Sequence, residues 1–169
     1  MPLEAWLRGP VDGVAPMLVP VAHMLQHAHD DGAEALKDLT AEQIWARPGG
    51  GASVGFHVRH LIGALDRLFT YARGEALTAD QFNASKREDD PGRPPADAAA
   101  LLAELAAATA RAIDQLRATD PITLFDPRGV GRQHVPSTVF GLLVHGGEHS
   151  ARHAGQALTL KRVVLSAKC

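Results

Sequence analysis

The chain has 169 residues, of which 46% are hydrophobic and only 5% aromatic, and its formal net charge is −2. This length suits one domain with a buried core, and we expect a single domain over residues 1–169. The near-neutral charge predicts no basic face, which argues against nucleic acid as a partner. Because Cys169 is the only cysteine, disulfides within the chain and cysteine-based zinc sites are excluded.

The N-terminal segment "MPLEAWLRGPVDGVAPM" lacks the basic start and apolar run of a secretory signal. No apolar stretch approaches the roughly 20 residues needed to cross a bilayer. The absence of paired cysteines fits a reducing compartment. We therefore expect a cytoplasmic protein that does not bind membranes.

Helical periodicity begins after Pro16 and predicts a first helix over residues 17–38. A capping-box pattern follows at Thr40 and Gln43, which predicts a short helical turn. The second helix is predicted from Ser53, a suitable N-cap, to Gly74, which is well placed to end it. Apolar residues at helical spacing define the inward faces of both helices: Leu18, Val21, Leu25, Gly32, Leu36 and Leu39 in the first, and Val54, Val58, Leu61, Leu65, Leu68 and Ala72 in the second.

Residues 75–95 are polar and proline-rich, and they predict a long connection within one domain. A third helix is expected over residues 97–118, with Leu101, Leu105, Ala108, Ala112 and Leu116 facing inward. Residues 119–136 predict a loop with "DPRG" as a turn and a short hairpin. The fourth helix is expected from Ser137, as N-cap, to about Leu160. The predicted fold is all-α, a four-helix bundle with one long crossover.

Histidines are unusually frequent, with nine in the chain. His145, His149 and His153 follow one another at intervals of four in the fourth helix. Residues four apart are neighbours on a helix, so two such imidazoles can grip one divalent ion. All three cannot share an ion, because His145 and His153 are about 12 Å apart along the axis. The spacing leaves two possible pairs.

The same spacing recurs in the first helix, so a pair of histidines four residues apart does not by itself predict a metal site. His23 and His27 lie on the polar face beside Asp30 and Glu34, so we expect them to be solvated. His29 lies closer to the apolar stripe and is a candidate for lining a cavity.

"HGGEH" raises another alternative, because His145, Glu148 and His149 match the H-x-x-E-H pattern of the inverzincin proteases. Those proteases need an acidic third ligand well downstream. No Asp or Glu follows Glu148 in this chain. Glu148 is therefore predicted to be a pocket residue or a surface charge.

Two histidine ligands make an incomplete site, and the second helix offers a third in "FHVRHL". His57 and His60 lie there one turn apart, and periodicity alone does not choose between them. A three-histidine site with a vacant fourth position is the form in which zinc activates water or polarises a substrate.

Two motifs in this order resemble those of the DinB-like superfamily, also called DinB/YfiT-like. One is the His60-Leu61 pair, seven residues after the second helix's N-cap. The other is H-x-x-x-H-x-G-Q, formed by His149, His153 and Gly155-Gln156. The four-segment layout also fits, so the resemblance covers most of the chain. Ala154 departs from the pattern, where a basic residue is common.

The resemblance implies an up-down-down-up bundle that forms a homodimer. It implies His60, His149 and His153 as ligands of a divalent metal, with zinc and nickel known in the family. It also implies a small-molecule substrate and, in characterised members, a low-molecular-weight thiol, as in S-transferases and a thiol-dependent isomerase. The expected function is a metal-dependent S-transferase or hydrolase-like enzyme; the alternative is a non-catalytic, metal-stabilised bundle.

Further residues are predicted to line the pocket around the metal. They are His57, Tyr71, His145, Glu148, Gln156 and His29. Arg59, Arg67 and Arg152 could bind an acidic substrate, although a solvated face is the commoner fate of such arginines.

Overall fold

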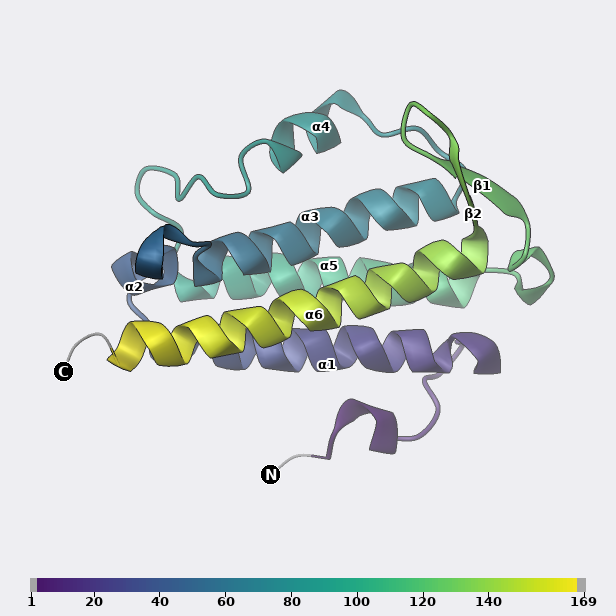
Figure 1. Cartoon of the computed structure of the whole chain (residues 1–169). Coiled ribbons are helices and arrows are strands. Elements are labelled where there is room, and N and C mark those ends of the chain that lie inside the picture. Colours follow the sequence, from purple (N-terminus) through teal and green to yellow (C-terminus); the bar gives the residue numbers. More distant parts are fainter. Residues whose placement is uncertain (1–2, 167–169) are drawn as a thin grey trace.

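The computed structural model describes residues 3–166 and is a helical bundle with one small β-hairpin (Figure 1). The helices are α1 (Val19–Leu36), α2 (Ala41–Trp45), α3 (Val54–Ala72), α4 (Ala79–Ser85), α5 (Ala98–Ala118) and α6 (Val139–Ser166). The strands are β1 (Pro127–Val130) and β2 (Val135–Thr138), and single 3-10 turns lie at Ala5–Leu7, Pro16–Leu18, Pro48–Gly50 and Pro121–Thr123.

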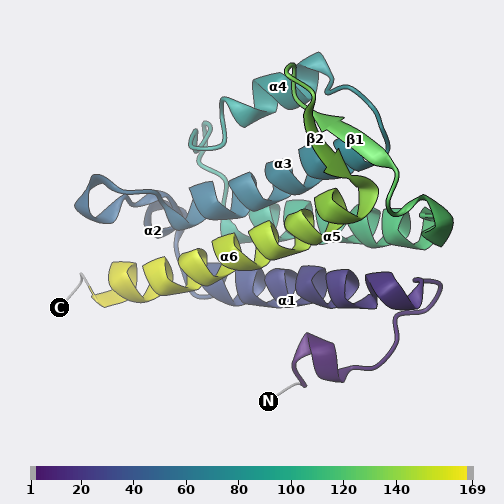
Figure 2. The ribbon, with the colours of Figure 1, turned by 45° about the vertical axis from the view of Figure 1, so that its right-hand side comes forward.

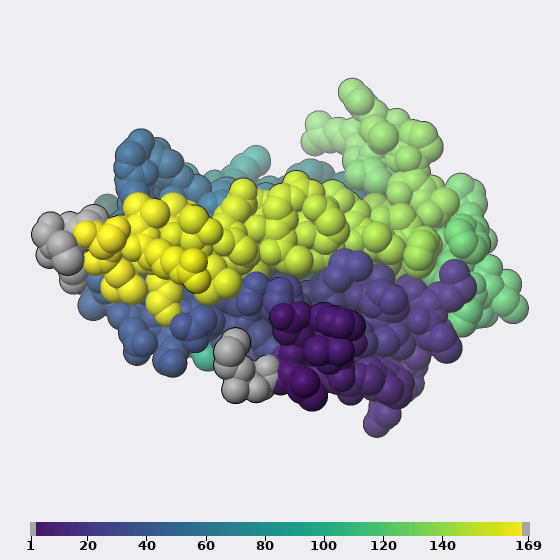
Figure 3. Space-filling model, turned by 60° about the horizontal axis from the view of Figure 1, so that its bottom comes forward, coloured from purple at the N-terminus to yellow at the C-terminus, as the bar shows by residue number. Residues whose placement is uncertain are grey.

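The four long helices have the expected up-down-down-up order. Figures 1 and 2 show α1 and α6 running in one direction and α3 and α5 in the other. α6 has its most extensive contacts with α3 and α1, and α5 also packs against both of these helices. The space-filling view shows α6 as a continuous ridge along one face, with the hairpin projecting at its start (Figure 3).

The predicted inward faces are confirmed, with one exception. The apolar stripes of α1 and α5 are buried throughout, as are five of the six residues proposed for α3. Leu68 is half-buried, and Phe69, which is 3% exposed, fills the core in its place. The ends of α3 are also as predicted: Ser53 Oγ accepts a hydrogen bond from Phe56 N–H at 3.0 Å, and Gly74 follows the helix with φ +81°.

The predicted boundaries of the last helix were wrong at both ends. Ser137 belongs to β2, and Thr138 caps α6 instead, its Oγ1 accepting a hydrogen bond from Gly141 N–H at 3.0 Å. α6 continues past Leu160 to Ser166. Its last turns remain packed on the bundle, because Val164 is buried and Lys161 Nζ lies 3.1 Å from Glu34 Oε1.

The predicted hairpin is present, but the turn predicted at "DPRG" is wrong, because most of that stretch forms a strand. Pro127–Val130, which includes most of "DPRG", forms β1 and pairs antiparallel with Val135–Thr138. The chain reverses at residues 131–134, where His134 N–H donates to Gly131 O at 3.1 Å.

The long connection contains a helix that the sequence analysis missed. α4 starts with a capping box between Thr78 and Gln81, the pattern recognised at Thr40. Gln81 also fastens α4 to α3, because its Nε2 donates to Asp66 Oδ2 at 2.7 Å and to Thr70 Oγ1 at 2.8 Å. The crossover therefore covers one side of α3 (Figure 1).

A glycine pair lets α6 approach its neighbours closely. A Cβ at Gly146 would lie 2.8 Å from Phe69 Cε2 in α3, and one at Gly147 would lie 3.1 Å from Met24 Cβ in α1. This approach brings α6 close enough to α3 for short side chains to meet.

No helix within residues 3–166 has both the length and the apolar character required to cross a membrane. The homodimer expected from the family resemblance stays a prediction.

We predict that Gly146→Ala destabilises the fold by about 1–3 kcal/mol, because the added methyl group overpacks against the buried Phe69 ring. Urea unfolding measures the loss. Gly155→Ala, in the same helix with nothing within 4 Å of the added atom, is the control and should stabilise by about 0.5–1 kcal/mol. Equal stability of Gly146→Ala and wild type would contradict the close-packing argument.

Candidate metal centre

Three histidines from two helices meet on one side of the bundle. α3 supplies His60, and α6 supplies His149 and His153, one turn apart. Each histidine offers one ring nitrogen, and these three nitrogens all lie within 4.8 Å of one another. His60 Nε2 and His149 Nε2 are 3.1 Å apart, and the His153 ring centroid is 4.5 Å from each of the other two. We call this cluster the triad.

The triad fits a divalent cation. Two nitrogens that bind one zinc ion lie about 2.0–2.1 Å from it, so they can be at most about 4.2 Å apart. The 3.1 Å contact meets this limit, and the 4.8 Å bound on the whole set needs only small side-chain adjustment. Imidazole nitrogens suit zinc and nickel, among other transition metals.

A carboxylate that the sequence analysis did not select fixes the orientation of His60. Glu88 lies just after α4, and its Oε2 is 2.7 Å from His60 Nδ1. A carboxylate only accepts, so His60 Nδ1–H is the donor, which leaves Nε2 unprotonated in the neutral ring. Histidine ligands of metals commonly hold their other nitrogen in this way.

Two α3 residues hold Glu88 in place. Arg67 Nη1 donates to Glu88 Oε1 at 2.8 Å, and the Glu88 side chain is only 10% exposed. Gly63 provides the space, because a Cβ there would lie 2.5 Å from Glu88 Oε1. Burial acts to raise the pKa of Glu88, but hydrogen bonds from His60 and Arg67 outweigh it and hold the pKa below its usual value.

His153 has a partner of its own behind the triad. His57 Nδ1 lies 2.9 Å from His153 Nδ1. When His153 donates this bond, its Nε2 is the nitrogen left for a metal. The structure thus separates the two candidates in α3: His60 joins the triad, and His57 supports it.

His149 differs from the other two members. Its Nδ1 is buried and has no hydrogen-bond partner within residues 3–166. A buried, unpaired ring nitrogen is costly in a finished core. It is the Nε2 of this ring that faces His60, so the unpaired Nδ1 is a separate polar group and is not part of the triad contact.

The surroundings favour neutral imidazoles, the form that binds metals. Burial, then the adjacent His60 and His149, lowers the pKa of His153 to about 4. Burial is also the main cause of the lowered pKa of His149, followed by His60 and His145. The pKa of His57 is lowered by burial and then by His60.

Two cavities adjoin the triad. The first, of about 460 Å³, contains His60 and His149 in its wall together with Tyr71 and His145. We call it the triad cavity. The second, of about 470 Å³, is lined by His57 and Gln156 on the other side. Tyr71 and His145 therefore border the cavity that has two triad members in its wall, whereas His57 and Gln156 border a separate cavity whose lining contains no triad member.

The remaining predicted residues have other partners. Glu148 forms ion pairs with Arg152 and, at 3.4 Å, with His145 on the exposed surface of α6. His29 lies on α1 with its Nδ1 3.4 Å from Asp30 Oδ1, and it lines neither cavity. The role of His29 as a pocket residue therefore stays a prediction.

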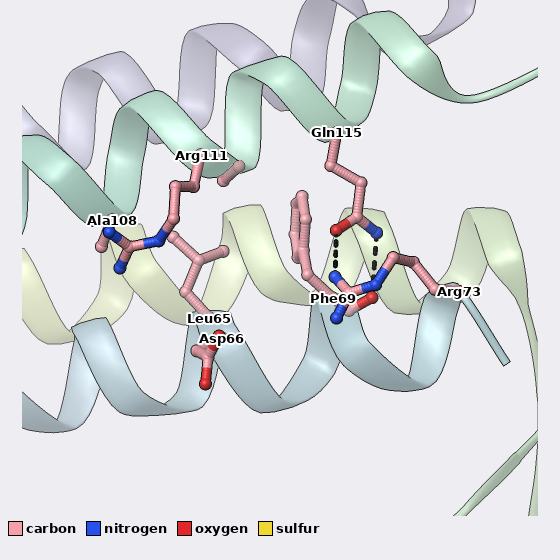
Figure 4. A pocket seen from close by; sticks show the side chains of 8 residues that line it. Leu65, Asp66, Phe69, Arg73, Ala108, Arg111 and Gln115 are labelled. Atoms are coloured by element: carbon pink, nitrogen blue, oxygen red, sulfur yellow. Dashed lines mark hydrogen bonds between the residues drawn. The ribbon is translucent and has the colours of Figure 1, made fainter. Parts of the chain in front are cut away.

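A third cavity, of about 190 Å³, lies between α3 and α5 (Figure 4). Its polar residues include Arg73 and Gln115, which are hydrogen-bonded to each other, and Arg111. Its lining, within the described part of the chain, includes no histidine. We therefore place the functional site at the triad.

Comparison with known proteins gives independent evidence on the family and the fold. Residues 3–157 match the sequence model of the DinB superfamily. Among solved structures, the chain is similar to a conserved protein from Enterococcus faecalis, with a TM-score of 0.70 and 22% identity over 88% of this chain and 97% of that one. At this identity the likeness shows the fold alone. No curated protein matches the sequence.

We predict that Glu88→Gln weakens zinc binding about 10- to 100-fold, because the neutral amide no longer raises the basicity of His60. Competition with a chromophoric chelator measures the affinity. Glu104→Gln, which neutralises an exposed acid on α5, is the control and should bind zinc as the wild type does. An unchanged affinity in Glu88→Gln would show that the His60–Glu88 bond plays no part in metal binding.

The metal-free protein should lose stability between pH 7 and pH 5. Unfolded His153 takes up a proton near its ordinary pKa of 6.5, whereas the folded side chain stays neutral down to about 4. The unfolded state therefore binds more protons in this range, so the free energy of unfolding falls as the pH falls.

Chelator-treated protein should accordingly melt at a lower temperature at pH 5 than at pH 7. His153→Gln should reduce this difference, and His27→Gln, on the exposed face of α1, should keep it. A difference of the same size in His153→Gln would contradict the neutral state assigned to His153.

Proposed function

Because the chain belongs to the DinB superfamily and gathers three histidines beside a cavity, we propose that it is a divalent-metal-dependent enzyme acting on a small molecule. The observation that carries the proposal is the convergence of His60, His149 and His153 with two of their rings in the cavity wall. Zinc and nickel are the metals we propose.

A divalent ion held by three neutral imidazoles keeps its full +2 charge and lowers the pKa of a water or thiol in a remaining coordination position. We propose a thiol-dependent transferase first and a hydrolase second, since both reactions need an open position beside the substrate. The triad cavity supplies that position.

The residues around the triad have distinct proposed roles. Glu88 and His57 fix the orientations of His60 and His153 through the 2.7 Å and 2.9 Å contacts. Ala64 and Leu68 give the triad cavity an apolar wall that limits water beside a bound substrate. Orientation by the protein of groups that act in the transition state contributes strongly to catalysis.

Two polar side chains in the cavity remain available to a substrate. The Tyr71 hydroxyl makes no hydrogen bond with any residue in 3–166, and His145 is about half exposed. We propose that they contact polar groups of the substrate. Arg67 lines the same cavity, but its bond to Glu88 gives it a supporting role.

A metal-stabilised bundle without catalysis is the second candidate. It is favoured by one observation: His60 connects the crossover, through Glu88, to α6, through His149. A metal at the triad would strengthen this connection between three segments of the chain. A stabiliser that binds only the folded state raises the melting temperature by mass action.

We predict that untagged wild-type protein contains stoichiometric zinc or nickel and that His149→Ala loses it, because two imidazoles alone hold a divalent ion weakly. Elemental analysis measures the metal. His27→Ala, which changes an exposed histidine paired with Asp31, is the control and should keep the wild-type content. Retention of full metal content by His149→Ala would overturn the assignment.

The cobalt-substituted protein separates the two candidate functions. An open site should bind 2-mercaptoethanol and develop thiolate-to-cobalt charge-transfer absorption. A closed, purely structural site should give a spectrum that no thiol changes, while the metal still raises the melting temperature.

A further inference from the structure

The triad cavity continues towards the hairpin. A cavity of about 570 Å³ lies between the end of α3, the loop that follows it and the hairpin. We call it the hairpin cavity. It shares Tyr71, Leu77 and Phe82 with the triad cavity, so the two form one groove along α3. Figure 2 shows α4 and the hairpin on the same side of α3.

The far end of this groove is basic. Arg128, Arg132 and His134, all from the hairpin, line the hairpin cavity. Arg128 is fixed there, because its Nε donates to Ala72 O and its Nη1 to Pro127 O, each at 2.9 Å. These bonds leave its Nη2 uncommitted.

The positive charge at this end is largely uncompensated. Arg132 has no hydrogen-bond or ion-pair partner in the described part of the chain. Glu75 is the only acid among the described residues that line the cavity, and it already pairs with Arg73 at 2.7 Å. The guanidinium groups of Arg128 and Arg132 are therefore available to an anion, which they can bind through several N–H donors.

The middle of the groove is apolar. Phe82 is 41% exposed there, beside Leu77 and the Tyr71 ring. A cavity with apolar walls and a few placed polar groups is typical of small-molecule sites. An exposed aromatic residue in such a wall gives a ligand a contact surface.

We propose that Arg128 and Arg132 bind an anionic group, a carboxylate or a phosphate, of an elongated substrate whose other end reaches the triad. The inference rests on the proposed function, because the triad defines the reacting end. It adds a binding subsite and a substrate class: molecules with an anionic group remote from the reacting atom.

The spacing along α3 sets the length of that molecule. Arg128 is fixed to the carbonyl of Ala72, which lies twelve residues after His60. At 1.5 Å per residue the two positions are about 18 Å apart along the helix. An extended peptide of about five residues spans this distance.

Soluble thiol peptides test the subsite in the cobalt-substituted protein. The probes are N-acetylated peptides of one cysteine followed by one to four glycines, with a free C-terminal carboxylate or a C-terminal amide. A third set ends in phosphoserine amide. The cysteine thiolate binds cobalt and reports binding through its charge-transfer absorption. Dissociation constants are compared between acid and amide at each length.

The carboxylate or the phosphate peptide should bind about 2- to 5-fold more tightly than the amide at the longer lengths only, as expected for a partly exposed ion pair. The tighter of the two identifies the preferred anion. Arg132→Gln should reduce the preference, because Arg128 alone remains, without changing the binding of N-acetylcysteine amide. Arg111→Gln, which removes an exposed arginine beside the α3–α5 cavity (Figure 4), is the matched control and should keep it.

Two results would overturn the inference while leaving the proposed function intact. One is equal affinity of acid, phosphate and amide at every length. The other is an anion preference of the same size in Arg132→Gln and Arg111→Gln. If no thiol perturbs the cobalt spectrum, the proposed open site itself fails, and the subsite falls with it.

Discussion

The close contact between α6 and α3 is the constraint on which the site depends. His60 reaches from one helix and His149 and His153 from the other, and imidazole side chains are short. Gly146 allows the approach, because any larger residue would meet the ring of Phe69. The same helix pair buries much of the core, with Leu65 and Leu143 in one apolar cluster. The packing of α3 against α6 therefore determines both the apolar core and the geometry of the triad.

The crossover between α3 and α5 supplies the carboxylate that orients His60. Glu88 lies outside the bundle, yet its carboxylate reaches His60 because Gly63 leaves room and Arg67 supplies a counter-charge. α4 positions this segment through the bonds from Gln81 to Asp66 and Thr70. A buried carboxylate is stable only with such partners. The polar connection is thus an integral part of the centre.

The sequence predicted the bundle well, because apolar residues recur at helical spacing and Ser53 and Gly74 mark the ends of α3. The sequence predicted α4, the hairpin turn and the role of Glu88 less well, because no long-range periodicity marks them. The capping box at Thr78 has the same pattern as the one at Thr40, and it marks the start of α4. The position of the hairpin turn depends on pairing between β1 and β2. Glu88 lies among acids in "KREDD", and no periodicity distinguishes it from Asp89 or Asp90. Its role follows from the folding of the crossover onto Gly63, which is a tertiary contact.

The different roles of His57 and His60 also follow from tertiary contacts that the sequence does not reveal. Both lie on one flank of α3, one turn apart, so the helical period treats them alike. The tertiary contacts differ: His60 faces His149 and is bonded to Glu88, whereas His57 faces the far side of His153. Exchanging their roles would leave Glu88 without its histidine and His153 without its support. The centre therefore depends on a layer of partners behind the triad, contributed by the crossover and by α3 itself, and this layer gives two of its three imidazoles a defined orientation.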